Sequence, residues 1–357
     1  MDYNLLVINP GSSSTKIAVY KNETAILKHI IKHIDLSQYK NIFEQLPMRK
    51  KAIIDFLEKS GYSPDFFSAI AVRGGILPPV DAGAYVVNHA MVELIKSGAL
   101  IEHASNLGAL IAYDLTKKAN IKAYIYDAVS TDQLDEIARI SGMAALPRRS
   151  NFHALNSRAV AAKIAKSMER QYNECTFIVC HMGGGISLSI HKKGRVVDLI
   201  ADDEGPFSPE RAGKVPCMDL IKLCFSETYD YQKLSQMLRG NGGLIAYLGT
   251  SDGEEIVSRI NSGDDKAELL FKAMAYQIAK GIGELSTVVS GKVDSIILTG
   301  GLAASPLLTR WIKKRTEFIA PVRVVAGEYE MEALALGILK VLRNEEKANE
   351  FIYSFTP

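Results

Sequence analysis

Cysteine is scarce in this sequence, and long hydrophobic runs are absent from it. The 357 residues include four cysteines, none of them in a C-x-x-C pair, and no histidine pair has zinc-finger spacing. These patterns favour reduced thiols in a cytoplasmic protein over a disulfide framework or a structural zinc. No apolar run approaches the roughly 20 residues that span a bilayer. The first residues also lack the basic start and apolar core of a signal peptide, so we expect no membrane partner.

A strong excess of charge is also missing. The chain has 42 basic and 40 acidic residues, a net charge of +2, which gives no electrostatic argument for a nucleic-acid partner. Hydrophobic residues make up 47%, as in ordinary globular proteins. The length exceeds the roughly 250–300 residues at which a single core stops growing, so the sequence predicts two domains.

Two common nucleotide signatures, G-x-x-x-x-G-K-[ST] and G-x-G-x-x-G, do not occur in the chain. Three turns rich in glycine or serine, called the glycine turns below, nevertheless follow apolar runs that have the character of strands: 9–16 (NPGSSSTK), 181–185 (HMGGG) and 299–302 (TGGL). Backbone N–H groups in such turns can converge on a phosphate, because small residues let the main chain approach closely. One such turn is commonly a plain hairpin. Three of them predict a nucleotide fold of a different class.

The order of elements repeats along the chain. A strand, a small-residue turn and a second strand at 5–20 lead through a charged turn to a third strand at 25–33. The same order returns at 177–198, with weak identity between the copies. This order predicts two similar α/β domains, each an antiparallel meander beside parallel strands, unless common hairpins coincide. Helices are expected at 48–60, 104–119, 264–289 and 331–344, and further strands at 69–73, 123–126 and 295–298.

Together the motifs resemble the acetate and butyrate kinase family, and several of them are more similar to its butyrate-specific members. The first two turns resemble the family's phosphate loops, and the third resembles its adenosine loop. Further matching blocks lie in the family's order: 73–75 (RGG), 102–106 (EHASN), 126–127 (YD), 151–156 (NFHALN) and 206–213 (PFSPERAG). The matches run from residue 5 to about residue 340, nearly the whole chain.

The resemblance implies an α/β fold of two ribonuclease-H-like, actin-like ATPase domains that flank an active-site cleft. The expected spans are 1–152 plus 331–357 for the first domain and 153–330 for the second. ATP or ADP is the implied cofactor. The residues expected to bind it are Asn9, Gly11, Ser12, Ser14, Lys16, His181, Gly183, Gly184, Gly185, Gly300 and Gly301.

The implied reaction is phosphorylation of the carboxylate of a short-chain fatty acid to an acyl phosphate. A carboxylate with a pKa near 4 is already ionised at pH 7 and needs no general base. Catalysis then consists of positioning and of neutralising charge, which predicts direct in-line transfer without a phosphoenzyme. The resemblance gives catalytic roles to Arg73, Asp127, His153 and Arg211, and to His103 unless that histidine is structural. Arginines suit such anions because they bind oxygens in pairs.

Magnesium is the expected metal, since it binds few protein oxygens and keeps several waters. The resemblance points to Asn9 and Glu330 around it. Family members usually show Asn-Glu-Glu before the last helix, whereas this chain has Tyr329-Glu330-Met331-Glu332. Glu330 aligns better, and Glu332 stays an alternative.

Acetate kinases carry two valines after the cleft arginine, where this chain has Gly74 and Gly75. One hypothesis is that the glycines leave room for a longer acyl chain, with each buried methylene worth about 0.8 kcal/mol. The other is that they serve only the backbone geometry. Butyrate is the expected acid, with acetate, propionate or a branched acid as alternatives.

More distant alternatives share the fold: an actin-like, nucleotide-driven binding module or an exopolyphosphatase. The two arginines and His153 favour an anionic acceptor over both. By resemblance, the chain is also expected to form a homodimer or a larger homo-oligomer.

Overall fold

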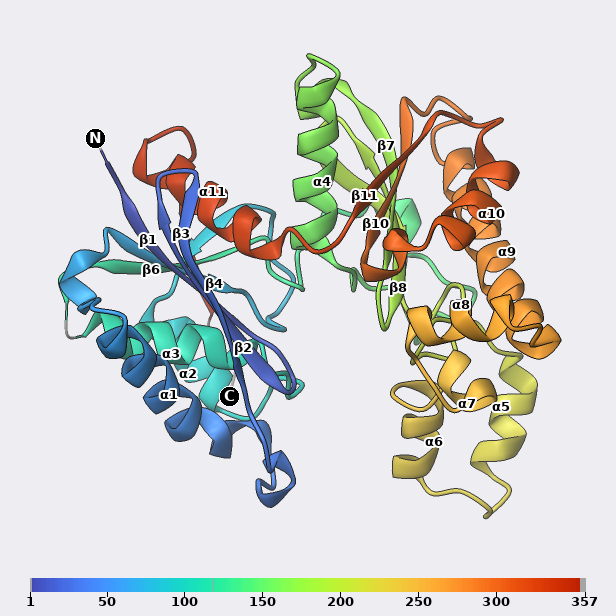
Figure 1. Cartoon of the computed structure of the whole chain (residues 1–357), viewed down its shortest axis with the longest axis horizontal. Coiled ribbons are helices and arrows are strands. Elements are labelled where there is room, and N and C mark those ends of the chain that lie inside the picture. The colour runs from blue at the N-terminus through green and yellow to red at the C-terminus, as the bar shows by residue number, and fades with distance from the viewer. Residues whose placement is uncertain (1, 118, 354–357) are drawn as a thin grey trace. The chain divides into compact units, whose positions relative to one another are not determined.

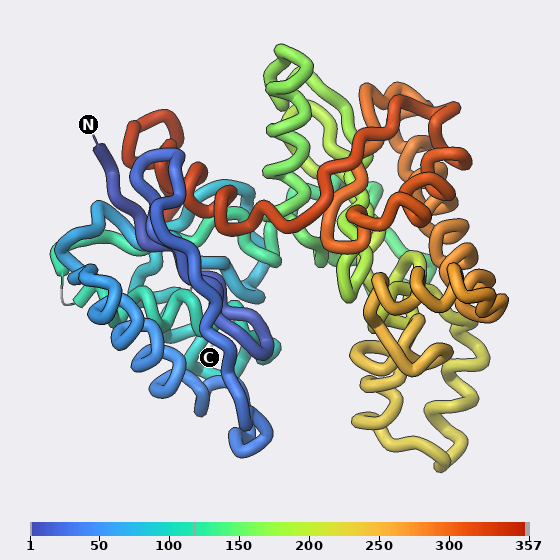
Figure 2. Tube along the Cα trace, in the orientation of Figure 1, coloured from blue at the N-terminus to red at the C-terminus, as the bar shows by residue number. Residues whose placement is uncertain are grey.

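The computed structural model describes residues 2–117 and 119–353, and it divides into two compact units. The first unit combines Met1–Asp132 with Tyr329–Pro357, and the second is Gln133–Glu328. Both ends of the trace, blue and red in Figure 2, therefore belong to the first unit. The expected domain spans differ from this division in two places, because they assign 133–152 to the first domain and 329–330 to the second.

The first unit is built on a sheet with the strand order β12-β5-β6-β4-β1-β2-β3. β1, β2 and β3 form an antiparallel meander, and β4 and β6 continue the sheet parallel to β1. The strands are β1 (Asn4–Pro10), β2 (Ser14–Lys21), β3 (Thr24–Lys32), β4 (Ala69–Arg73), β5 (Ala84–Val86), β6 (Lys122–Tyr126) and β12 (Asn349–Glu350). The expected meander beside parallel strands is confirmed here.

Helices cover both faces of this sheet, as Figure 1 shows. The helices are α1 (Leu46–Lys59), α2 (His89–Lys96), α3 (Asn106–Thr116) and α11 (Glu330–Leu342). Leu6 and Ile8 of β1 pack with α1, α2 and α3 in one apolar core, while Leu5 and Val7 are buried on the opposite face, where α11 contacts the sheet. Side chains alternate along a strand, so the run Leu5–Ile8 of β1, which is apolar at every position, is buried on both faces of the sheet.

The second unit repeats the plan with the strand order β11-β10-β7-β8-β9. Its meander is β7 (Thr176–Met182), β8 (Ile186–Lys192) and β9 (Arg195–Ile200), and β10 (Ser295–Gly300) and β11 (Val322–Ala326) extend it in parallel. Apolar residues on one face of β7 and β8 pack with α9 (Asp265–Thr287) and α10 (Pro306–Thr316). The other face is covered by α4 (Ala154–Ser167) (Figure 1).

The segment 133–152 packs on β9, which explains why it belongs to the second unit. Leu134, Ala138 and Phe152 form a small core with residues of β9. Arg148 fastens the segment further: its Nη1 donates to Asp198 Oδ1 at 2.9 Å and to the Ala138 carbonyl at 2.8 Å. These contacts join residues that are close in space, but the residues follow no repeating apolar pattern. The strand pattern of the sequence therefore does not reveal them.

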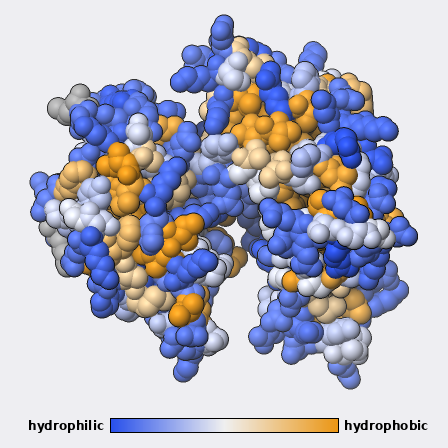
Figure 3. All heavy atoms as spheres, viewed as in Figure 1, coloured by the Kyte–Doolittle hydropathy of each residue, from blue (hydrophilic) through white to orange (hydrophobic). Residues whose placement is uncertain are grey.

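Shorter helices complete the second unit: α5 (Cys217–Cys224), α6 (Tyr231–Leu238), α7 (Leu244–Leu248) and α8 (Gly253–Asn261). Single turns of 3₁₀ helix are η1 (Leu36–Gln38), η2 (Ile42–Gln45), η3 (Pro64–Phe66), η4 (Glu136–Arg139), η5 (Tyr172–Glu174) and η6 (Gly301–Ala304). The face drawn in Figure 3 is mostly hydrophilic, with apolar atoms in separate patches. Among the described residues, no helix combines the length and apolar character that a membrane span needs.

Candidate active site

Three of the expected site residues lie at one edge of the first sheet. β1, β4 and β6 run parallel, with Ile8, Val72 and Ile125 paired in one row, and Asn9, Arg73 and Tyr126 follow these residues at the carboxyl ends. Asp127 follows Tyr126 directly. Ligands of open α/β sheets bind at the carboxyl ends of the strands, because the strands there present their loops together. The sheet therefore brings Asn9, Arg73 and Asp127 to the edge where a ligand is expected.

Glu330 joins two of these residues. Asn9 Nδ2 donates to Glu330 Oε2 at 2.7 Å, and Arg73 Nη1 lies 3.2 Å from the same oxygen. Glu330 is 6% exposed and is the first residue of α11, whose positive N-terminal end favours a carboxylate. Glu332 is exposed instead. The structure thus places Glu330, the better aligned of the two glutamates, beside Asn9.

Asp127 is buried, and its backbone has a conformation that residues other than glycine rarely adopt. Its φ is +40°, and two hydrogen bonds to Gly83 hold it there. Gly83 N–H donates to Asp127 Oδ1 at 2.8 Å, and Asp127 N–H donates to the Gly83 carbonyl at 3.1 Å. Aspartate tolerates the left-handed region better than most residues, and such strain is concentrated at functional sites.

The first glycine turn closes tightly after β1. Gly11 N–H donates to the Ser14 carbonyl at 2.8 Å. Gly11 has no positive φ, and a Cβ there would meet the Ser14 carbonyl oxygen at an ordinary 3.5 Å. The turn itself therefore does not require glycine. Ser12 is exposed, Ser14 is half-buried, and Lys16 lies on β2 directly opposite Asn9.

Gly74 and Gly75 do not open onto free space, so the hypothesis that they leave room for an acyl chain is wrong in this structure. A Cβ on Gly75 would lie 1.8 Å from Asn106 Oδ1 and 2.8 Å from Asn106 Cα. A Cβ on Gly74 would lie 2.7 Å from the Ala128 Cβ. Asn106 Oδ1 accepts from Ile76 N–H at 2.8 Å, which fixes this close approach. Both glycines serve the backbone.

His103 stands before α3 in a local network. Its Nδ1 is 2.5 Å from Ser105 Oγ, and Ser105 N–H donates to the same nitrogen at 3.3 Å. These contacts suit the structural alternative for His103, and its catalytic role stays a prediction.

In the second unit, two expected histidines stack face to face. The rings of His153 and His181 have centroids 3.8 Å apart and an angle of 11° between their planes. His153 Nδ1 lies 2.8 Å from Ser187 Oγ on β8. His181 and Met182 are the last two residues of β7, both are buried, and Gly183, Gly184 and Gly185 follow them.

Asn156 of α4 joins the second and third glycine turns. Its Nδ2 lies 2.9 Å from His181 Nδ1 and donates to Thr299 Oγ1 at 3.2 Å. An amide nitrogen can only donate, so His181 Nδ1 accepts and the ring proton is on Nε2. His181 thereby presents a donor on the side of the second turn, where a Cβ on Gly183 would lie 3.3 Å from Nε2.

The two glycines of the third turn have different roles. Gly300 has φ +89°, and a Cβ there would lie 2.4 Å from the Met182 carbonyl oxygen, so only glycine lets β10 approach β7 at this point. A Cβ on Gly301 would meet nothing within 4 Å. Gly301 therefore faces open space, as a residue beside a bound nucleotide would.

Arg211 lies among carboxylates next to the second turn. Its Nε is 3.4 Å from Asp202 Oδ2, and its Nη1 is 3.6 Å from Glu210 Oε2. Asp202 also pairs with Arg239. The close fit extends to the turn, since a Cβ on Gly184 would lie 2.9 Å from Glu210 Oε2. Arg211 is thus held in place within the second unit, as Glu330 holds Arg73 in the first.

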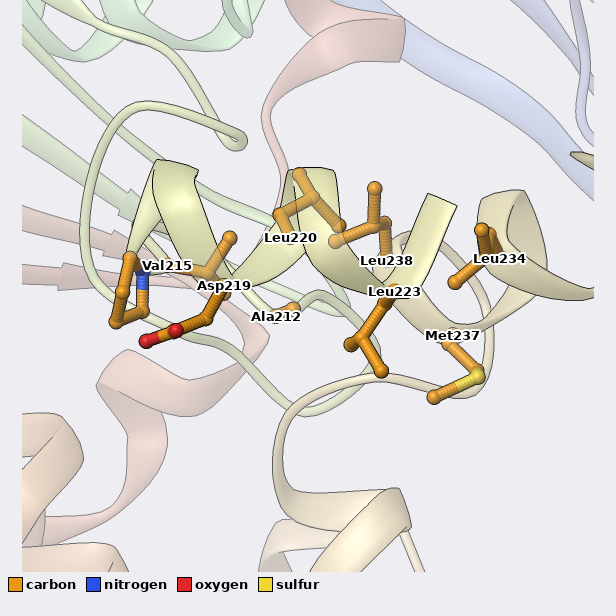
Figure 4. A pocket seen from close by; sticks show the side chains of 9 residues that line it. Ala212, Val215, Asp219, Leu220, Leu223, Leu234, Met237 and Leu238 are labelled. Carbon is orange, nitrogen blue, oxygen red and sulfur yellow. The ribbon is translucent and has the colours of Figure 1, made fainter. Parts of the chain in front are cut away.

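An apolar pocket lies beside the Arg211 loop, between α5 and α6 (Figure 4). Its lining is Ala212, Val215, Pro216, Asp219, Leu220, Leu223, Leu234, Met237 and Leu238. This set contains none of the expected catalytic or nucleotide-binding residues and a single charged group. It is unsuited to a polyphosphate, which needs several donors.

Comparison with known proteins decides the family. The sequence model described as the acetokinase family matches residues 136–313. The chain is 47% identical over 353 residues to "Butyrate kinase 1" of Clostridium acetobutylicum, which covers 98% of this chain and 99% of that one. This chain belongs to the acetokinase family. The members of this family are ATP-dependent kinases, so family membership implies ATP and ADP as the nucleotides.

Solved structures of the family share its fold. The structure is similar to acetate kinase of Porphyromonas gingivalis, with a TM-score of 0.80, 18% identity, and coverage of 95% of this chain and 100% of that one. It is also similar to a propionate kinase of Francisella tularensis, with a TM-score of 0.76, 17% identity, and coverage of 94% and 98%. The expected actin-like, two-domain α/β fold is confirmed.

Sequence reasoning missed residues that hold the site in place. Asn156 belongs to a matching block, but no motif marks Ser187 or Arg49, whose guanidinium donates to the Gly11 and Ser12 carbonyls of the first turn. One signal for Arg49 was present: Arg49, Ile53 and Leu57 are four residues apart, which places the arginine on the buried stripe of its helix. An arginine on an apolar stripe calls for a partner in the interior.

The close approach at Gly75 predicts that Gly75→Ala destabilises the protein by about 1–3 kcal/mol, the usual cost of overpacking. Gly283→Ala is the matched control, because its helical position has nothing within 4 Å of a Cβ and should gain about 1 kcal/mol. Thermal unfolding midpoints measure both. A Gly75→Ala variant of unchanged stability whose acid preference shifts would restore the hypothesis of an open pocket.

Proposed function

We propose that the chain transfers the γ-phosphoryl group of ATP to the carboxylate of butyrate, giving butyryl phosphate and ADP. One observation carries this proposal: the 47% identity to "Butyrate kinase 1" extends over 98% of the chain. Such coverage includes every expected site residue, rather than one domain or one motif. The family's carboxyl-group phosphotransfer is thereby assigned to this chain, with butyrate as its best supported acid.

The reaction needs no proton transfer. A carboxylate oxygen forms a bond to the γ-phosphorus while the bond from that phosphorus to the β,γ-bridging oxygen breaks, and ADP leaves with the electron pair. The barrier is the approach of two anions, so cationic groups contribute most. We assign this role to Arg73 and Arg211, with His153 as a further donor and Asp127 near the transferring group.

The three glycine turns are the proposed contacts of the nucleotide. The first turn offers Ser12 and Ser14 together with Lys16, and the second offers the Nε2 proton of His181. The open side of Gly301 supports the third turn as the place of the adenosine. Each turn follows a buried strand, so its backbone donors are positioned before the nucleotide arrives.

Magnesium suits the residues beside the first turn. No group of three or more histidine, cysteine or acidic side chains suited to a metal occurs in the described ranges, which argues against a metal held by protein alone. Asn9 and Glu330 offer one amide oxygen and one carboxylate, the small donor set of a magnesium ion that binds mainly to phosphates. When bound, the ion would neutralise charge on the ATP phosphates, with Asn9 and Glu330 as its protein contacts.

The preferred acid and the assembly state can each be tested by measurement. Acetate, propionate and branched acids are the alternative acceptors, and an exopolyphosphatase or a nucleotide-driven binding module would need no acid at all. A homodimer or larger homo-oligomer and a cytoplasmic location stay predictions from the family resemblance.

The decisive experiment couples ADP release to a spectrophotometric signal, with and without acid. We expect ADP release to require the acid, and kcat/KM to be about tenfold higher for butyrate than for acetate. Burial of two more methylenes, at about 0.8 kcal/mol each, gives this ratio. A ratio below one would remove butyrate as the preferred acid, and release without any acid would overturn the kinase assignment.

The two glutamates of α11 provide a matched pair of variants. Glu330→Gln keeps an acceptor for Asn9 but removes the charge, so we expect kcat to fall by about 10² and to need more Mg²⁺ for saturation. Glu332→Gln, on the exposed side of the same helical turn, should stay within about twofold of the unmodified protein. Titrations of Mg²⁺ at saturating ATP and butyrate measure both variants. Equal Mg²⁺ dependence in Glu330→Gln and the unmodified protein would refute the role of Glu330.

A further inference from the structure

A buried arginine lies directly beneath the first glycine turn. Arg49 of α1 has an exposed fraction of 0%, and it shares the buried face of its helix with Ile53 and Leu57. No carboxylate pairs with it anywhere in the described part of the chain. A buried charge without a countercharge is costly, so its neighbours must satisfy it in another way.

The backbone of the first turn supplies most of what Arg49 needs. Its Nη1 donates to the Gly11 carbonyl at 2.8 Å and to the Ser14 carbonyl at 3.3 Å, and its Nη2 donates to the Ser12 carbonyl at 2.7 Å. Gln45 Oε1 accepts from Nη2 at 2.8 Å and from Nε at 3.1 Å. The planar guanidinium has five N–H donors spread over three nitrogens, so it can reach carbonyls that lie farther apart than the three donors on one ammonium nitrogen can reach.

The carbonyl groups of the first turn have hydrogen-bond partners within the protein, whereas two of its N–H groups do not within the described residues. The Ser13 carbonyl accepts from His33 N–H at 2.9 Å, so all four carbonyls of residues 11–14 have donors inside the protein. The N–H groups of Ser12 and Ser13 donate to no acceptor within residues 2–117 and 119–353. The turn therefore keeps its acceptors for the interior and presents its donors outward, as an anion site requires.

Of the two basic side chains Arg49 and His33 near the first turn, only Arg49 is charged at pH 7. His33 Nε2 lies 2.8 Å from Thr15 Oγ1, and burial together with the charge of Arg49 lowers the pKa of His33 to about 4. His33 is accordingly neutral at pH 7. Arg49 is then a buried positive charge beneath the turn, and no carboxylate within residues 2–117 and 119–353 pairs with it.

We propose that Arg49 is a positioning residue, which fixes the first turn in its phosphate-binding form and adds an uncancelled positive charge beneath it. The inference rests on the proposed function, since the turn is taken to hold the phosphates of ATP. Arg49 acts through the backbone of Gly11–Ser14 and touches no substrate. A misplacement of about 1 Å at such a turn costs about 10²-fold in rate, because the reacting groups lose their alignment.

The test compares Arg49→Met and Arg49→Lys with the unmodified protein. We expect kcat/KM for ATP to fall by about 10²-fold in Arg49→Met, and by less in Arg49→Lys, which keeps the charge but not the fork. The KM for butyrate should stay within about twofold, since the acid binds elsewhere. A purely structural role would lower the folded fraction and leave these constants unchanged per folded molecule.

Arg148→Lys is the matched control. Arg148 also donates to backbone carbonyls and is mostly buried, but it contacts Asp198, Glu204 and the segment 133–152, and these partners lie outside the three glycine turns. We expect it to lower the unfolding midpoint while kcat/KM for ATP stays within about twofold. An Arg49→Met variant that is folded and has an unchanged kcat/KM for ATP would overturn the proposal.

Two further measurements separate this proposal from the proposed function. If the unmodified protein shows no acid-dependent ADP release, the dissociation constant of Mg-ADP still tests Arg49, and it should rise in both Arg49 variants. If the variants do not fold, amide exchange of the unmodified protein replaces them. Mg-ADP should then protect Ser12 and Ser13, and unchanged exchange at both amides would overturn the proposal.

Discussion

A buried carboxylate connects three parts of the first unit that are distant in sequence. Glu330 lies 321 residues from Asn9 and 257 from Arg73 in sequence, and one of its oxygens contacts both. A buried carboxylate is tolerated only with such partners, so this contact specifies where α11 begins and how it meets the ends of β1 and β4. The same contact orients the arginine that we assign to the transfer and the asparagine that we assign to the magnesium ion. Stability and function therefore depend on the same three side chains.

The chemistry imposes a matching constraint, since two anions must meet. Both proposed clamps have carboxylate neighbours within their own units: Arg73 has Glu330, and Arg211 has Asp202 and Glu210. Guanidinium groups placed in this way lose little side-chain entropy when an anion binds, because their conformations are already limited. Arg49 differs from these two arginines. Its hydrogen bonds go to backbone carbonyls of the first turn, so no carboxylate of the described residues cancels its charge there.

Much of the fold could be predicted because its signals are local. The repeated meander followed from apolar runs and small-residue turns, and the long helix expected at 264–289 extends from Asp265 to Thr287. Asn9, Arg73 and Asp127 were found from motifs, and their meeting follows from the parallel order of three strands. Periodicity and turn chemistry are sufficient for features of this kind.

The features that could not be predicted depend on contacts across long sequence distances. Gly74 and Gly75 suggested an open pocket, but the side chain and backbone of Asn106 occupy the space beside Gly75. The segment 133–152 joins the second unit through a small core and through Arg148, neither of which has a periodic pattern. From the sequence, Arg49 is one of several basic residues in a helix, and only the structure shows its carbonyl partners. In each case the decisive neighbour is remote in the chain.

The central claim is that the phosphoryl group passes directly from ATP to butyrate. Charge neutralisation assists this step, and no covalent enzyme intermediate forms. The stereochemistry at phosphorus tests it most directly. ATP made chiral at the γ-phosphorus with oxygen isotopes would be converted with butyrate, and the configuration of the butyryl phosphate would be determined. A single in-line displacement predicts inversion. Retention would require two displacements, and with them a phosphorylated side chain that contradicts the account.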